Sequence, residues 1–227
     1  MRATTVLWDI DGTLLRSGAV APDAFLDAVA EVTGARPSPE GRDYGGRLDS
    51  EIAEMLLTAV GAETARTAEV LAALQRHVFE RLDELRAHTR AYPGVDALLA
   101  KLAAAGVRQT VVTGNIASVA RYKLEAAGLV PPIELAPGGF GDSAANRAAV
   151  ARVALDRLAA AGWQPDPGEV WIVGDTPRDL ACAQAVGVRC ALVATGRRTV
   201  ADLTGLGADI VLPDLSDPRP LLDLWRI

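Results

Sequence analysis

Two aspartates, one residue apart, follow a short apolar segment near the start of the chain. The segment Thr4–Trp8 runs directly into Asp9–Thr13, which reads DIDGT. An apolar run of this length is typical of a strand buried on both faces, and ligands of open α/β sheets bind beyond the carboxyl ends of the strands. Two carboxylates buried there without a cation or other partners would be costly. The spacing therefore predicts that Asp9 and Asp11 belong to a functional site.

More polar residues follow predicted strands later in the chain. Thr113-Gly114-Asn115 ends one apolar run, and Asp175 ends another. Asp179 lies four residues further on, so a helix beginning near Pro177 would keep it close to Asp175. Carboxylates in this number require a cation, and oxygen ligands without a His or Cys cluster favour Mg²⁺ over zinc. A hydroxyl beside backbone N–H groups at the start of a helix suits phosphate oxygens.

The elements that must position these residues alternate between strand and helix from about residue 93 onward. Apolar runs predict strands over 107–113, 133–136, 170–173, 189–194 and 209–212. Helical spacing predicts helices over 116–127, 143–161 and 176–186, and a short helix at the end of the chain. This alternation is typical of βαβ units. The fold class is therefore predicted to be α/β, a doubly wound parallel sheet with a Rossmann-like core.

Residues 16–90 break the alternation. Amphipathic helices are predicted over 22–33, 49–60 and 63–87, and no strand is obvious among them. Residues 36–46, which are rich in Pro and Gly, predict a loop inside this block. We therefore expect a Rossmann-like core made of residues 1–15 and 91–227, interrupted by an all-helical cap domain of residues 16–90.

The three motifs, in this order and at strand ends, resemble those of the haloacid dehalogenase superfamily. They are DIDGT at 9–13, Thr113-Gly114-Asn115, and GDTPRD at 174–179. The helical block resembles the superfamily's cap in the first insertion position. The segment Gly46–Asp49, together with Ile52, resembles a cap segment of the phosphoglycolate phosphatase-like branch. The resemblance covers essentially the whole chain.

The resemblance implies a role for each residue of the motifs. Asp9 would be the nucleophile that forms an aspartyl-phosphate, and Asp11 the general acid and base. Asp11 also separates phosphate-handling members from dehalogenases, which share only the first aspartate. Mg²⁺ would be held by Asp9, Asp175 and the backbone carbonyl of Asp11, and Asp179 would support it directly or through water. Thr113, Gly114 and Asn115 would bind the phosphate.

The basic residue that should contact the phosphoryl group departs from the superfamily pattern, which usually has a lysine in a Lys-Pro context. Gly141-Asp142-Ser143 precedes a predicted helix start, and Arg147 falls on the first or second turn. Arginine would bind phosphate as a fork and stay charged. Arg147 is therefore the favoured candidate, and Lys123 is the main alternative. Arg47, in the cap segment, could contact an acidic substrate.

Composition narrows the function further. The 227 residues carry a net charge of −6 and no basic run, which argues against a nucleic-acid partner. No apolar stretch reaches the ~20 residues of a membrane span, no signal peptide is visible, and the two cysteines suit a reduced cytoplasmic protein. Together with this composition, the resemblance implies a monomeric or homodimeric Mg²⁺-dependent phosphatase of a small phosphorylated metabolite, a phosphoglycolate-like organic phosphate. A phosphomutase of the same superfamily and a non-catalytic binding module are the alternatives.

Overall fold

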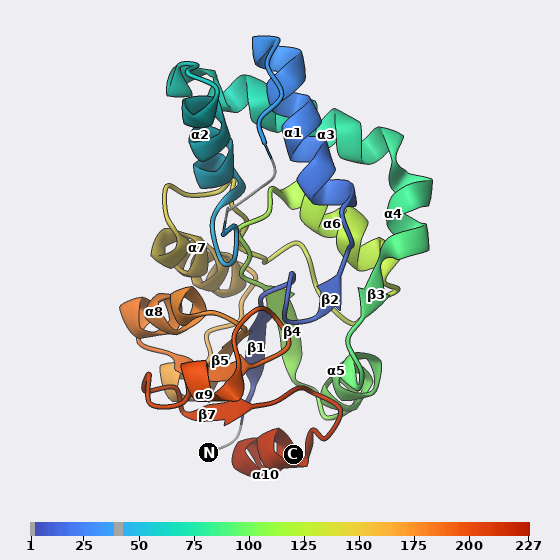
Figure 1. Cartoon of the computed structure of the whole chain (residues 1–227). Coiled ribbons are helices and arrows are strands. Elements are labelled where there is room, and N and C mark those ends of the chain that lie inside the picture. Colours follow the sequence, from blue (N-terminus) through green and yellow to red (C-terminus); the bar gives the residue numbers. More distant parts are fainter. Residues whose placement is uncertain (1–2, 39–42) are drawn as a thin grey trace.

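A parallel five-stranded sheet forms the centre of the computed structural model, which describes residues 3–38 and 43–227. Its strand order is β4-β1-β5-β6-β7, and β1 pairs in parallel with both β4 and β5. The fold class predicted from the sequence is confirmed (Figure 1). The strands are β1 (Thr5–Trp8), β4 (Arg108–Val111), β5 (Val170–Gly174), β6 (Arg189–Val193) and β7 (Ile210–Leu212).

Both faces of the sheet are covered by helices, because successive side chains of a strand point to opposite faces. On β1, Val6 and Trp8 pack into one apolar cluster and Leu7 into another. Residues of α5, α6 and α10 contribute to the first cluster, and residues of α7, α8 and α9 to the second. These helices are α5 (Val95–Ala104), α6 (Ala117–Ala126), α7 (Arg147–Ala160), α8 (Pro177–Val186), α9 (Val200–Leu203) and α10 (Arg219–Trp225).

The helical block lies above the carboxyl end of the sheet (Figure 1). It consists of α1 (Val20–Thr33), α2 (Asp49–Ala59), a 3₁₀ turn (Thr64–Arg66), α3 (Thr67–Glu80) and α4 (Leu82–His88). The two chain segments that connect it to the core pair as antiparallel strands, β2 (Leu15–Arg16) and β3 (Arg90–Ala91). The domain boundaries predicted from the sequence fall on this pair.

The apolar cluster of the helical block does not end at these boundaries. Ile116 and Val119, at the start of the core helix α6, are buried in it, and Tyr122 packs against it. Helix α6 therefore contributes one side to the core cluster and another to the cap cluster.

Four sequence predictions differ from the structure. Residues 133–136 form no strand. They lie beside β4 and are hydrogen-bonded to it, for example from Glu134 N to Gln109 O (2.7 Å), but the prolines on either side have no N–H to donate to a strand ladder. The predicted helix 143–161 begins instead at Arg147, where the Asn146 side chain caps it by accepting from Ala149 N (2.9 Å).

The predicted helix 63–87 is broken at Arg81, after which α4 turns to pack on α6. Strands β2 and β3 were not foreseen, because two residues each give no periodic signal. Part of the predicted loop 36–46 lies outside the described residues. No helix in the described part of the chain is long and apolar enough to cross a membrane.

Candidate active site

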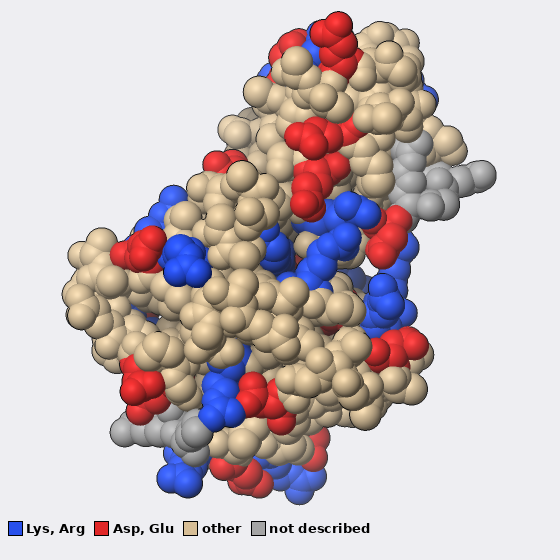
Figure 2. Space-filling model, turned by 90° about the vertical axis from the view of Figure 1, so that its left-hand side faces the viewer, with Lys and Arg blue, Asp and Glu red and all other residues tan. Residues whose placement is uncertain are grey.

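A cavity of about 980 Å³ separates the helical cap from the carboxyl end of the sheet. Figure 2 shows Lys and Arg side chains gathered around the recess between the two parts. The strand ends, the cap loop before α2 and the loop after β6 all contribute to its wall. The site residues predicted from the sequence that line it are Asp9, Asp11, Arg47, Thr113, Gly114, Asn115, Arg147 and Asp175.

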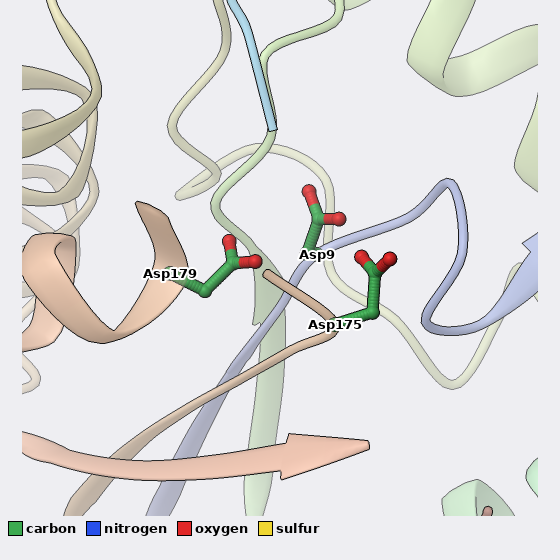
Figure 3. A group of neighbouring side chains, drawn as sticks. All are labelled: Asp9, Asp175 and Asp179. Atoms are coloured by element: carbon green, nitrogen blue, oxygen red, sulfur yellow. The ribbon is translucent and has the colours of Figure 1, made fainter. Parts of the chain in front are cut away.

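Three carboxylates meet on the core side of this cavity. Asp9 follows β1, Asp175 follows β5, and Asp179 lies in the first turn of α8. Because β1 and β5 are parallel neighbours, their carboxyl ends lie side by side. Oxygen atoms of the three side chains lie within 4.8 Å of one another, and Figure 3 shows the Asp9 and Asp175 carboxylates side by side at the strand ends, with Asp179 beside them. Only 0–5% of each residue is exposed.

The crowding changes the electrostatics of these groups. Burial, and to a smaller extent the charges of Asp179 and Asp11, raises the pKa of Asp9 to about 7, although Arg147 opposes the rise. Burial and the charges of Asp9 and Asp179 raise the pKa of Asp175 to about 8. The two carboxylates are therefore costly to ionise in the absence of an additional cation.

Arg147 is the cation that the chain places among these carboxylates. It is the first residue of α7, and one of its terminal nitrogens, Nη2, donates to Asp9 Oδ1 (2.6 Å) and to Asp179 Oδ1 (2.5 Å). Its side chain is only 10% exposed, and its Nε has no hydrogen-bond partner within residues 3–38 and 43–227. A buried donor without a partner is unfavourable, so this nitrogen is available for an oxygen of a bound anion.

The donor set fits a divalent cation. When all three carboxylates are ionised, they and the one guanidinium leave a local charge of about −2, and carboxylate oxygens are the ligands that Mg²⁺ prefers. Thr13 donates to Asp175 Oδ1 (3.4 Å), while Thr176 donates to Asp179 Oδ2 from its backbone N (3.0 Å) and its hydroxyl (2.8 Å). These bonds fix the direction in which the carboxylates point.

A second polar cluster surrounds Asp11. Lys123 Nζ lies 2.6 Å from Asp11 Oδ2 and 2.7 Å from Asn115 Oδ1. Asn115 Nδ2 donates to the same Asp11 oxygen (2.8 Å) and to Thr113 Oγ1 (2.9 Å). Arg147 and Lys123, which the sequence left as alternatives, therefore both reach the cavity, on different carboxylates.

Glycine is required in the loop after β1. Gly12 has φ +86°, and a Cβ there would lie 2.5 Å from Asp175 Oδ2. A side chain would therefore cost backbone strain and displace a carboxylate of the proposed metal site.

The cap contacts the core loop 113–116 through its segment Arg47–Asp49. Asp49 N donates to Gly114 O (2.8 Å), and Asp49 Oδ2 accepts from Ile116 N (2.8 Å). A Cβ on Gly114 would lie 1.9 Å from Arg47 O, so only glycine permits this approach. Burial raises the pKa of Asp49 to about 7, although the Lys123 charge opposes the rise.

Asp179 does not line the cavity but lies behind Arg147. Neither Thr13 nor Thr176 was predicted as a site residue from the sequence. Thr176 carried a recognisable signal, because Thr-x-x-Asp at the start of a helix is a capping-box pattern. Arg178, which also lines the cavity and donates to Gly45 O (2.6 Å), carried none.

Comparison with known proteins agrees with this arrangement. The model of the haloacid dehalogenase-like hydrolase family matches residues 6–184, which include all three motifs. The chain is a member of the haloacid dehalogenase-like hydrolase family. Among its relatives, phosphoglycolate phosphatase of Rhodospirillum rubrum is 34% identical over 95% of this chain and 92% of its own length. Phosphoglycolate phosphatase of Caulobacter vibrioides is 29% identical over 99% of this chain and 93% of its own.

Solved structures share the fold of this haloacid dehalogenase-like hydrolase. A hydrolase from Pseudomonas syringae superposes with a TM-score of 0.70 at 18% identity, covering 97% of this chain and 98% of that one. CbbY from Rhodobacter sphaeroides, solved in complex with phosphate, superposes with a TM-score of 0.68 at 20% identity, covering 95% and 96%.

Proposed function

We propose that the protein is a Mg²⁺-dependent phosphatase that hydrolyses a small phosphorylated metabolite through an aspartyl-phosphate on Asp9. The observation that carries the proposal is the buried group of Asp9, Asp175, Asp179 and Arg147 at one end of the cavity. Mg²⁺ held by Asp9, Asp175 and the backbone carbonyl of Asp11, with Asp179 supporting it directly or through water, would neutralise charge on the nucleophile and the phosphoryl oxygens.

Two displacements complete the reaction. In the first, a carboxylate oxygen of Asp9 attacks phosphorus and the bond to the ester oxygen breaks. The electron pair goes to that oxygen, which takes a proton from Asp11. In the second, a water oxygen attacks the same phosphorus, gives its proton to Asp11, and releases the Asp9 carboxylate. Arg147 would bind the phosphoryl oxygens through its Nε, assisted by the Thr113 hydroxyl and by Gly114 and Asn115.

The substrate class follows from the relatives and from the cap. Two curated relatives that match most of the chain are named phosphoglycolate phosphatase, which favours a phosphatase over a phosphomutase. Arg47 from the cap loop and Arg178 from α8 add positive charge to the cavity wall, which suits an acidic organic phosphate. We therefore propose a phosphoglycolate-like substrate, with Arg47 contacting its organic part.

Phosphate release from a panel of phosphorylated metabolites, including 2-phosphoglycolate, tests the proposal. The wild type, Asp9→Asn and the exposed control Asp156→Asn would be assayed with Mg²⁺ and with EDTA. We expect release that requires Mg²⁺, persists in Asp156→Asn, and is lost in Asp9→Asn. Full turnover by Asp9→Asn would remove the nucleophile assignment. Absence of release from every ester in the panel would reject the phosphatase.

A further inference from the structure

Lysine is rare in this protein, and one of its few copies is buried in the cavity. Of the 23 basic residues only two, Lys101 and Lys123, are lysines, and the other 21 are arginines. Lys101 is exposed on α5, whereas Lys123 on α6 is only 5% exposed. Lysine is almost never buried unless it is paired. In a chain whose other basic residues are nearly all arginines, the smaller cation, Lys123, therefore occupies a buried position.

The contacts of Lys123 form a closed ring with two other side chains. Its ammonium donates to Asp11 Oδ2 and to Asn115 Oδ1, and the Asn115 amide donates to the same Asp11 oxygen. Each of the three groups thus bonds to the other two. The ring leaves the carboxylate of Asp11 little freedom to rotate. The side-chain hydrogen bonds described for the Asp11 carboxylate both end on Oδ2, which leaves Oδ1 for the substrate.

The geometry of the ring explains why lysine is used. An ammonium is a compact group whose three donors diverge, so it can bond two acceptors that lie close together. The planar guanidinium of arginine is larger and suits a bidentate partner. Arg147 and Lys123 also share no partner: Arg147 bonds Asp9 and Asp179, and Lys123 bonds Asp11 and Asn115.

We propose that Lys123 is a positioning residue that, together with Asn115, holds Asp11 by Oδ2 so that Oδ1 faces the ester oxygen and the attacking water. The inference rests on the proposed function, in which Asp11 exchanges the proton in both displacements. A carboxyl group that can rotate spends less time in reach of its target, and orientation of this kind contributes strongly to catalysis.

Esters with different leaving groups can distinguish a loss of Asp11 positioning from a general loss of activity. An alkyl ester such as 2-phosphoglycolate needs a proton on the departing oxygen. The acidic phenol of 4-nitrophenyl phosphate departs without one, yet hydrolysis of the aspartyl-phosphate still needs Asp11 as base. Loss of Lys123 should therefore slow both steps with the alkyl ester but only the second step with the aryl ester.

The variants are Lys123→Met, Lys123→Arg and, as a matched control, Lys101→Met, each checked for folding by thermal unfolding. Rapid mixing with 4-nitrophenyl phosphate measures the release of nitrophenolate in the first turnover, and phosphate release measures steady turnover. Asn115→Ser removes the second donor to Asp11 Oδ2 and is used if Lys123→Met does not fold.

General acid–base catalysis contributes about 10²–10⁴-fold, so we expect Lys123→Met to slow turnover of both esters by about 10²-fold. The first-turnover rate with the aryl ester should stay within about threefold of the wild type, so that a burst of nitrophenolate appears. Lys123→Arg should behave like Lys123→Met, and Lys101→Met like the wild type. Asn115→Ser should also slow turnover more than the first turnover with the aryl ester, but by a smaller ratio than Lys123→Met, because Asn115 contributes to phosphate binding in the first step as well.

Unchanged turnover in Lys123→Met, or a burst that slows in parallel with turnover, would overturn the inference while leaving the phosphatase intact. Restoration of wild-type rates by Lys123→Arg would also overturn it, since charge alone would then suffice. Failure of the proposed function is distinct, because the wild type itself would then release no phosphate.

Discussion

Replacing Arg147 with methionine should lower the free energy of unfolding, because the crowded carboxylates at this site would lose their cation. One nitrogen of Arg147 bonds both Asp9 and Asp179, and all three side chains are at most 10% exposed. Methionine removes the charge without leaving a large void. Removing one partner of a buried ion pair typically costs about 3–5 kcal/mol, because the other charge stays buried and unpaired.

The size of the effect depends on pH. With the guanidinium present, the pKa of Asp9 is already about 7, and its loss raises that pKa further. At pH 6 the variant can therefore bind a proton at the site and avoid part of the cost, whereas at pH 8 protonation itself costs more. We expect a loss of about 3–5 kcal/mol at pH 8 and a clearly smaller loss at pH 6.

Urea unfolding in EDTA at the two pH values measures both losses. Arg121→Met is the control, since Arg121 is 57% exposed on α6 and exposed pairs contribute about 0–1 kcal/mol. Mg²⁺ should restore part of the stability lost in Arg147→Met by binding the uncompensated carboxylates. A loss below about 1 kcal/mol at pH 8, or equal losses at both pH values, would refute the reasoning.

Three further outcomes follow from the same geometry. In EDTA the wild type should lose stability as pH rises from about 5 to 8. The folded protein holds protons on Asp9, Asp49 and Asp175, with pKa values of about 7, 7 and 8, whereas the same groups in the unfolded chain, with pKa values near 3.8, have released them. The free energy of unfolding in urea should fall by up to about 1.4 kcal/mol per pH unit for each carboxylate, and a flat profile would count against the burial of these groups. Gly12→Ala should lower the free energy of unfolding by more than about 1 kcal/mol through backbone strain alone. Because the new Cβ meets the Asp175 carboxylate, the variant should also lose its thermal stabilisation by Mg²⁺. Intact stabilisation by Mg²⁺ would contradict the close approach of this loop to the carboxylate. Asp49→Ala should cost about 1–3 kcal/mol because Ile116 N loses its acceptor, measured by urea unfolding, and no loss would mean that this link between cap and core is dispensable.

The parts of the fold that could be predicted are those determined by local pattern. The apolar run before Asp9 predicts β1 because a strand covered on both faces needs apolar residues throughout. The same reasoning places Asp175 after β5, and parallel pairing then brings the two carboxylates together. The site of three acids could therefore be expected from positions far apart in the chain.

Tertiary contacts decided the rest. The helix that carries Arg147 begins four residues later than its periodicity suggests, because Asn146 caps it. The long helix predicted over 63–87 breaks where α4 packs on α6. Whether Arg147 or Lys123 reaches the cavity depends on the direction in which each helix presents its side chains, which spacing alone cannot give. The assumption that a single basic residue serves the site prevented the prediction that both residues reach the cavity.

Helix α6 belongs to the core, yet it contacts both the cap and the proposed general acid and base Asp11. Ile116 and Val119 are buried in the cap cluster, while Lys123, further along the same helix, holds Asp11. Fully burying an aliphatic side chain of this size contributes about 1.5–3 kcal/mol, so separating the cap from α6 would expose costly surface. The paired strands β2 and β3 are the connection about which the cap can move against the core, and such a movement would have to overcome the cost of separating the cap from α6.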